Sequence, residues 1–520
     1  DYLGGEFDGT FDDFFTATDA DGIRTFPVAP NRPIYAAAYI QDKFTFRDII
    51  FRVGLRVDRY DANTKVLKDP YSLYEIQSAN EFYGQTGGEK PASIGDDFKV
   101  YVEGENSDVV KAFRDGDNWF FANGTPANDG NLIFGGSLVF PKYTDDRANN
   151  EQFIQSRDFD PSVSFEDYEP QINWAPRLAF SFPISDEANF FAHYDVLVAR
   201  PQSNTLATPL DYFYFNNVAR TPENNPNLKP VRTIDYEVGF QQKLSNSSKM
   251  TVSAYYREMR DMIQLRTFLF LPAPITNYTA FDNLDFRTVK GFTFAYDLRR
   301  TNNVRLTTNY TLQFADGTGS NSNSQRGLTD RGNIRNLFPL DFDERHRFNA
   351  TIDYRYGSGA RYNGPRWFGK DVFSNLGLNL QAITVSGRPY TVKQTPTRFN
   401  GAGTDGAVNG ARKPWNVTLN ARLDKTFNIG KKVAGKQPVR MNVFFRVQNL
   451  LNTLNIVNVY AATGSADDDG FLASNDGQES LNSIDPSKQQ SFTDAYGWAL
   501  QNPTYYTLPR RMYIGANVSF

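Results

Sequence analysis

Residues 415–427 read WNVTLNARLDKTF, and their side chains alternate between apolar and polar along almost the whole stretch. One parity holds Trp415, Val417, Leu419, Ala421, Leu423 and Phe427, and the other holds Asn416, Thr418, Asn420, Arg422, Asp424 and Thr426. A period of two predicts a β-strand with one apolar and one polar face. The run is longer than the roughly 5 to 6 residues of an average soluble strand and reaches the about 9 to 11 that a tilted strand needs to cross a bilayer.

The same alternation recurs along the chain. We identify thirteen such runs, near residues 34–46, 49–60, 172–183, 188–199, 233–244, 249–264, 286–299, 303–315, 345–356, 374–387, 414–427, 438–449 and 509–520. Their polar parity carries charges of both signs, as the lumen of a barrel does, and the other parity carries aliphatic residues with aromatics near the run ends. The pattern predicts an all-β fold, a transmembrane antiparallel β-barrel. The alternative is a large soluble β-sandwich or adhesin, whose strands would be shorter.

The connections between the runs alternate between short and long. Long polar stretches occupy 61–171, 200–232, 265–285, 316–344, 388–413 and 450–508. Short turns on one side and long loops on the other are typical of outer-membrane barrels, with the short side periplasmic. We therefore expect residues 1–33 to end an extracellular loop, 34–520 to form barrel, and 61–171 to form a large extracellular insertion with strands near 98–104 and 131–140. Because bacterial single-chain barrels have an even strand number, we expect further strands before residue 34.

Composition excludes several other classes. The 520 residues include no Cys and only two His, so cysteine-ligated metals and Ser-His or Cys-His catalysis lack their residues. The net charge is −4, with both signs interspersed, which does not favour nucleic-acid binding. No apolar run reaches the about 18 residues of a transmembrane helix.

Several short motifs resemble one family. NPNLKP at 225–230, followed by Thr233 and YEVGF at 236–240, resembles the "NPxLKPE…YExGF" segment of TonB-dependent outer-membrane receptors, with Val231 where the family usually has Glu. YIQD at 39–42 with GLRVD at 54–58 resembles the family's "YxQDxW…GxRxD" hairpin, with Phe44 in the aromatic slot. VQNLLN at 447–452 and residues 509–520 are similar to its strand end and closing strand. Five motifs in order on predicted strands are far more specific than one.

Two further strings, APRL at 175–178 and PLDFDERH at 339–346, narrow the resemblance to the Oar-like branch, whose receptors carry a carboxypeptidase-regulatory-like domain before the plug. The resemblance spans about residues 34–520. It implies a barrel of about 22 strands around an N-terminal plug, with thirteen strands and no plug in this chain. The missing strands and plug would then precede this chain or come from a second chain that completes the barrel.

The resemblance also implies a function. It predicts active uptake of a bulky solute, such as a siderophore, glycan or peptide, across the outer membrane of a Gram-negative bacterium, driven through the plug by the TonB-ExbB-ExbD system, with a surface lipoprotein as a further candidate partner. It implies no enzymatic step. The alternative is a receptor-like barrel that serves as a structural or scaffold subunit of a surface or secretion complex.

Candidate functional residues follow from the same pattern. The terminal Phe520 resembles the assembly signal of such barrels. We expect seven charged residues to face the lumen: Arg52, Arg56, Asp58, Asp235, Glu237, Arg440 and Arg446. Asp235 and Glu237 could serve a hydrolase as a carboxylate pair, but we expect them to pair with arginines such as Arg52, Arg56, Arg440 or Arg446, or with a plug.

The loops hold the remaining candidates. Tyr212, Phe213, Tyr214 and Phe215 lie in one long loop, where they could contact a ligand or, equally, pack the loop or join an aromatic belt. The acidic strings at 19–22 and 467–470 could hold Ca²⁺, although a complete twelve-residue calcium loop is missing, and we otherwise expect no cofactor. The two histidines have no partner at metal-ligand spacing; His193 lies within a strand, and His346 has the apolar parity expected at a barrel rim.

Overall fold

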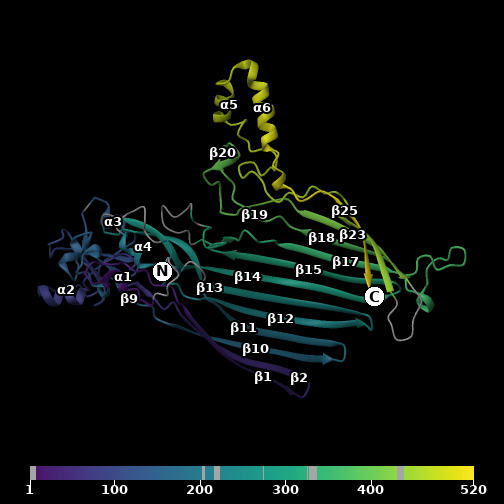
Figure 1. Cartoon of the computed structure of the whole chain (residues 1–520), viewed down its shortest axis with the longest axis horizontal. Helices are drawn as coiled ribbons and strands as arrows, with labels where there is room; N and C mark the ends of the chain where they lie inside the picture. The colour runs from purple at the N-terminus through teal and green to yellow at the C-terminus, as the bar shows by residue number, and fades with distance from the viewer. Residues whose placement is uncertain are drawn as a thin grey trace.

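The computed structural model describes residues 8–136, 138–201, 205–215, 223–272, 275–324, 326, 336–429 and 439–519. Thirteen long strands lie side by side in one antiparallel sheet, which we call the main sheet (Figure 1). They are β1 (Ile34–Phe46), β2 (Ile49–Asp61), β10 (Gln171–Ser185), β11 (Ala188–Ala199), β12 (Val231–Ser245), β13 (Ser248–Leu269), β14 (Asn277–Thr301), β15 (Val304–Gly317), β17 (His346–Arg355), β18 (Leu376–Val385), β23 (Asn416–Ile429), β24 (Val439–Gln448) and β25 (Arg511–Ser519). Each predicted run corresponds to one of them, so the predicted strands are confirmed.

The strands pair in sequence order from β1 to β25. Short β16 (Phe338–Pro339) adds to β15 near residue 316. Neighbouring strands keep one continuous register over most of their length, as in β1 and β2, where Ile34 pairs with Asp61 and Phe46 with Ile49. Within the described residues, β1 and β25 each pair on one side only. A single sheet of this width excludes the two packed sheets of a sandwich.

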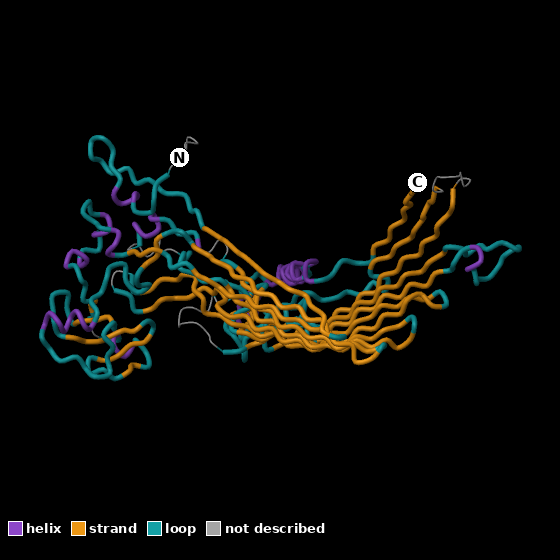
Figure 2. Tube along the Cα trace, turned by 90° about the horizontal axis from the view of Figure 1, so that it is seen from below, coloured by secondary structure: helices purple, strands orange, loops and turns teal. Residues whose placement is uncertain are grey.

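One face of the main sheet is apolar and exposed. Leu378 and Leu423, which face each other across β18 and β23, are 39% and 44% exposed. The same parity exposes Val238 on β12, Phe348 on β17 and Ile514 on β25. The strands bow together when seen from below, so the sheet is curved like part of a barrel wall (Figure 2). An apolar band this extensive is costly in water and stable against lipid tails.

The hairpin of β13 and β14 is longer than the sequence predicts. Their pairing continues past Met259 and Arg287, with irregular register at Met262, and ends at Leu269 and Asn277. The predicted loop at 265–285 is therefore wrong: most of it is strand. The alternation is interrupted near Asp261, which has a positive φ of 56°. That irregularity hides the continuation of the strand from a strict period-two reading.

The tip of this hairpin, residues 260–285, packs with residues 8–33, 62–170 and 205–215 into what we call the loop cluster, at the left end of Figure 1. Its helices are α1 (Asp13–Thr16), α2 (Ala79–Thr86), α3 (Asn131–Phe134), α4 (Pro209–Phe213) and the 3₁₀ turns at 146–149, 153–155 and 161–163. Its strands are β3 (Lys65–Leu67), β4 (Lys99–Val102), β5 (Val110–Asp115), β6 (Asn118–Phe121), β7 (Pro126–Ala127), β8 (Phe140–Pro141) and β9 (Phe165–Asp167). Buried aromatic residues form most of its largest core, including Phe14, Phe15 and Phe165.

The long insertion within the cluster has its own sheet. Strands β7, β6, β5, β4 and β8 pair in that order, and α2 covers a separate core of Phe82, Val100 and Phe113. The prediction of a strand at 98–104 is confirmed by β4. The strand predicted at 131–140 is wrong in part, because residues 131–134 form α3 and only 140–141 pair as β8. Gly135 and Gly136 end the helix where the sequence suggested continuous strand.

The remaining connections carry short elements. These are β19 (Pro389–Tyr390), β20 (Thr395–Thr397), β21 (Asn400–Ala402), β22 (Ala411–Arg412), α5 (Asn475–Asn482), α6 (Pro486–Leu500) and the 3₁₀ turns at 359–361 and 503–505. Helices α5 and α6 project as a hairpin beside the β25 edge (Figure 1). Asp485 begins α6 by accepting a hydrogen bond from the Ser487 N–H, with Pro486 at the first helical position. Among the described helices, none has the length and apolar composition that a membrane span requires.

Candidate functional site

The polar face of the main sheet carries charges that are paired within one strand or between strands. Arg56 Nη2 lies 2.8 Å from Asp58 Oδ1 on β2, and the Tyr35 hydroxyl of β1 also donates to Asp58. Arg355 Nη2 lies 2.7 Å from Asp424 Oδ1, spanning β17 and β23. Arg355 reaches Asp424 across the intervening strand β18, which is possible only in this register, so that pair stabilises the register as well as the charges.

Two acids pair with residues other than the arginines named from the sequence. Asp235 accepts from Arg257 Nε of β13 at 2.9 Å, and Glu237 Oε2 lies 3.8 Å from His193 Nδ1 of β11. The reason is register: Asp235 is directly opposite Arg257, and Glu237 is directly opposite His193. The arginines named from the sequence lie on strands several positions away in the sheet.

The other predicted lumen-facing charges stand on the polar parity of their strands. Arg446 of β24 stacks over the Tyr513 ring of β25, with 4.8 Å between Cζ and the ring centroid. Arg52 and Arg440 are exposed. Phe520 lies outside the described residues, so its role as an assembly signal stays a prediction.

The rim of the sheet beside the loops is aromatic. The His346 ring stacks on Trp415, with centroids 5.5 Å apart, and its Nδ1 lies 2.8 Å from the Tyr310 hydroxyl. This placement fits the rim role expected of His346. Rings with one apolar and one polar end suit the boundary between lipid and water.

The loop aromatics predicted to contact a ligand divide into two groups. Tyr212 and Phe215 are each only 2% exposed and belong to the core of the loop cluster, where Tyr212 packs edge-on against Phe165. A ligand-contact role does not fit these two, and the packing alternative explains them. Phe213 packs partly against the same core. Tyr214 is 37% exposed, so for Tyr214 ligand contact stays a prediction.

A buried ionic network joins the insertion to the β13–β14 hairpin. Arg114 of β5 pairs with Asp69 and lies over the Tyr71 ring, 4.5 Å from Cζ to the centroid. The Tyr71 hydroxyl donates to Asp117 at 2.9 Å and accepts from Arg266 Nη2 at 2.9 Å. Burial raises the pKa of Tyr71, which keeps its hydroxyl protonated for this double role.

Two of the motifs that resemble the family hold long connections against neighbouring strands. In the motif at 225–230, Leu228 is fully buried against Leu265 and Phe281, while the Lys229 N–H donates to Asn283 Oδ1 at 2.7 Å. In the motif at 339–346, Asp343 is fully buried, accepts from the Ala315 N–H at 3.0 Å and pairs with Arg412. Both motifs tie long connections to the strands beside them. Sequence reading marked these residues but not their contacts.

In both candidate calcium loops, acidic side chains accept hydrogen bonds from other groups of the protein. Asp19 Oδ1 accepts from the N–H groups of Asp21 and Ile23, and the buried Asp469 accepts from the Phe399 N–H and the Tyr496 hydroxyl. Within the part of the chain that the structure describes, no three acidic or histidine side chains are grouped as metal ligands.

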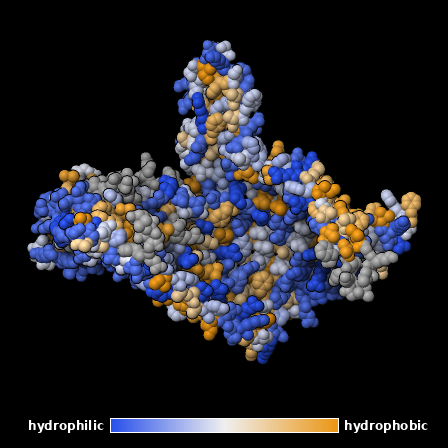
Figure 3. All heavy atoms as spheres, in the orientation of Figure 1, coloured by the Kyte–Doolittle hydropathy of each residue, from blue (hydrophilic) through white to orange (hydrophobic). Residues whose placement is uncertain are grey.

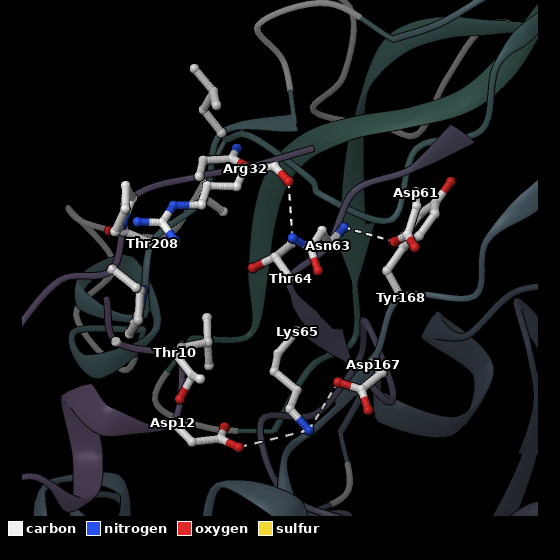
Figure 4. Close-up of a pocket in the computed structure, with 18 of the residues that line it drawn as sticks. Thr10, Asp12, Arg32, Asp61, Asn63, Thr64, Lys65, Asp167, Tyr168 and Thr208 are labelled. Carbon is white, nitrogen blue, oxygen red and sulfur yellow. Dashed lines mark hydrogen bonds and ion pairs between the residues drawn. The ribbon is translucent and has the colours of Figure 1, made fainter. Parts of the chain in front are cut away.

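A pocket of about 780 Å³ opens in the loop cluster beside the end of β2 (Figure 4). Its walls come from residues 8–12, 29–32, 61–65, 167–170 and 206–209. Lys65 Nζ lies 3.1 Å from Asp167 Oδ1 and 3.8 Å from Asp12 Oδ2, and Arg32 on the opposite wall pairs with Asp8 at 2.7 Å. Nothing in the sequence marks this site, because its five segments are separated in the chain and carry no shared motif.

The fold and the two faces of the sheet define a β-barrel protein of the outer-membrane type. The chain matches the family model for the "TonB dependent receptor-like, beta-barrel" over residues 1–450. It therefore belongs to the TonB-dependent receptor family. Barrels of this family are outer-membrane proteins of Gram-negative bacteria, and its members are transport receptors that work with TonB. No comparison assigns the Oar-like branch, which stays a prediction.

Several solved structures are similar in fold. The ferric-catecholate import receptor Fiu from E. coli K12 is 14% identical, with a TM-score of 0.38 over 83% of this chain and 42% of that one. The FrpB iron transporter from Neisseria meningitidis is 11% identical, with a TM-score of 0.41 over 86% and 46%. The ferric yersiniabactin uptake receptor FyuA from Yersinia pestis is 11% identical, with a TM-score of 0.39 over 82% and 42%. This chain thus spans less than half the length of these proteins. Comparison with curated protein sequences gave no match.

Proposed function

We propose that this chain provides wall, lumen and outer loops of a TonB-dependent transporter that imports a bulky solute across the outer membrane. The observation that carries the proposal is the main sheet itself, with an exposed apolar face opposite a face of paired charges. Lipid stabilises the first face, and a water-filled or plugged lumen suits the second.

The loop cluster supports a role in solute capture outside the cell. It is a folded unit with its own cores and it lies at the end of the sheet opposite most of the short turns (Figure 1). Its surface is mainly hydrophilic in the face that Figure 3 shows. We therefore propose that residues 1–33 and 61–171 are extracellular. Proteinase added to intact cells should cut within these residues while the short turn at 246–247 stays protected.

Uptake in paired deletion strains tests the function. One strain lacks this protein and the other lacks TonB, and both are offered labelled peptides, oligosaccharides and ferric chelates. We expect both strains to lose uptake of the same solute, because import needs the barrel and the energy supply together. Uptake that survives TonB loss but not loss of the protein would contradict energised transport. If neither deletion changes uptake while cell-surface assembly fails without the protein, the scaffold alternative replaces the proposal.

A further inference from the structure

The pocket beside β2 has a charge imbalance in its walls. Four carboxylates and two cationic side chains line it. Asp8 pairs with Arg32, and Asp61 pairs with Arg59 at 2.8 Å behind the wall. Asp12 and Asp167 then share one cation, Lys65, at 3.8 and 3.1 Å. The surplus of one negative charge therefore lies at the Asp12 and Asp167 wall.

One oxygen at this wall is not satisfied. Asp12 Oδ1 is buried and has no hydrogen-bond partner. Burial raises the pKa of Asp12, and the negative charges of Asp167, Asp13 and Asp160 act in the same direction against Lys65. The Asp12 side chain as a whole is 42% exposed, so a cationic donor in the pocket can pair with this carboxylate and balance its charge. Charge-assisted hydrogen bonds of this kind are among the stronger polar contacts in proteins.

The rest of the lining favours one of the three solute classes considered above, which are siderophores, glycans and peptides. Leu206 is 50% exposed, and Pro30 and Pro170 are two further exposed residues of the lining, so aliphatic surface contributes to the pocket. The two aromatic residues of the lining, Phe11 and Tyr168, are only 8% and 4% exposed, so neither offers a ring face for stacking on a sugar. An anionic metal chelate would meet the surplus negative charge. A peptide with a free amine meets complementary charge at Asp12 and Asp167 and apolar side chains elsewhere in the lining.

We propose that this pocket binds a short cationic peptide, with an amine of the peptide on Asp12 and Asp167 and its chain along Leu206, Pro30 and Pro170. The volume of about 780 Å³ lies within the range of roughly 300 to 1,000 Å³ typical of ligand pockets. The inference rests on the proposed function, because it names the class of solute that the transporter captures. Lys65 then sets selectivity by limiting the negative charge that the ligand meets.

Calorimetric titration of the detergent-purified chain tests the assignment. The probe is a five-residue peptide of lysine and alanine with a free amino terminus, and its counterpart carries glutamate in place of lysine and an acetylated terminus. We expect the cationic peptide to bind and the acidic one not to. Asp12→Asn should weaken binding roughly tenfold, the loss expected when a hydrogen bond to a charged group is removed. Lys65→Gln should tighten binding of the cationic peptide, because it leaves both carboxylates without their cation.

A matched control keeps the test specific. Asp97→Asn makes the same chemical change at an exposed carboxylate outside the pocket and should leave binding unchanged. Equal binding of the two peptides, equal effects of Asp12→Asn and Asp97→Asn, or binding of a neutral oligosaccharide in preference to the cationic peptide would each overturn the assignment. Peptide binding that follows these substitutions in a protein whose uptake ignores TonB would support the pocket and reject the transport function. TonB-dependent uptake of a solute other than peptide would support the transport function and reject the assignment of the pocket to peptides.

Discussion

The main sheet and the loop cluster are stabilised by different kinds of contact. In the sheet, each long strand pairs with the next long strand in the chain, and its charges pair with groups on the same strand or on a strand close by, as Asp235 does with Arg257. In the loop cluster, the contacts join residues far apart in sequence: Tyr71 meets Arg266, and Phe11 packs against Tyr212. The sheet is thus a product of local pairing and its lipid surroundings, whereas the cluster depends on a few buried long-range contacts.

This difference predicts which substitutions destabilise each region. A strand in the sheet keeps its ladder of backbone hydrogen bonds when one polar pair is removed, and the cations of its pairs reach solvent, with Arg56 and Arg355 32% and 31% exposed. In the cluster, both partners of the Arg114–Asp69 pair are buried, at 3% and 11% exposure, so water cannot replace either of them. Substitutions in the cluster should therefore unfold it locally and leave the sheet intact, and substitutions on the lipid face should do the opposite.

The largest effect is expected at the buried ion pair of the cluster. Arg114→Met leaves Asp69 buried without its cation, and breaking such a pair costs about 3 to 5 kcal/mol. We expect limited proteolysis to cut the insertion of the variant rapidly while the main sheet stays uncut. Lys111→Met is the control, since its pair with Glu103 is exposed and worth at most about 1 kcal/mol. Similar proteolysis of both variants would remove the distinction between the two regions.

The next effect is expected on the lipid face. Leu378→Arg places a charge on the exposed apolar face of β18, which costs about 2 to 4 kcal/mol near the middle of a bilayer. Gln381→Arg places the same charge on the polar face of the same strand and should be tolerated. The folded fraction in vesicles as urea is added measures both. If Gln381→Arg is the more damaging, the two faces have been assigned in reverse.

A smaller effect is expected from the tyrosines of the cluster. Burial raises the pKa values of Tyr71, Tyr143 and Tyr212, so the folded cluster keeps protons that an unfolded chain releases near pH 10. This stabilisation is complete below about pH 10 and is lost as the pH rises through the higher folded pKa values. Tyr71→Phe should cost about 1 to 2 kcal/mol at neutral pH and reduce the alkaline loss. Tyrosinate absorbance and proteolysis across the pH range would show whether the cluster opens before the sheet as the pH rises. Loss of the sheet before the cluster would contradict the prediction.

The smallest effect on stability is expected at Tyr214. Because this side chain is 37% exposed, Tyr214→Ala should change the free energy of unfolding by less than about 0.5 kcal/mol. Tyr212→Ala, two residues away but buried, should cost about 3 to 5 kcal/mol and loosen the cluster. Chemical denaturation measures both, and solute uptake by the two variants separates contact from packing. Normal uptake with Tyr214→Ala would end the prediction that Tyr214 contacts the solute.

Sequence reading identified the elements of the sheet but not all of their partners. The alternation in 415–427 and 346–356 predicts both strands and both faces, because side chains on a strand have a fixed period. It could not predict that Glu237 lies opposite His193, since that depends on the register between strands. It also missed α5 and α6, although Asp485 and Pro486 are a helix-start signal, because the surrounding polar stretch was interpreted as loop throughout.

The candidate site shows more clearly what could not be predicted from the sequence. Asp12, Lys65 and Asp167 lie in three segments without a shared motif, and only folding of the cluster brings them to one wall. Likewise, the aromatic string at 211–215 could not reveal which rings are buried, because burial depends on the neighbours that Phe11 and Phe165 supply.

Local chemistry along the chain thus determines the strands, their two faces and the membrane as their environment, since each follows from side-chain period and hydrophobicity within about a dozen residues. The tertiary structure alone decides the ion-pair partners, the burial of Tyr212 and the pocket at Asp12, since each arises from contacts between segments that close long loops. Such contacts are selected by the packing of the whole cluster rather than by any one of its segments.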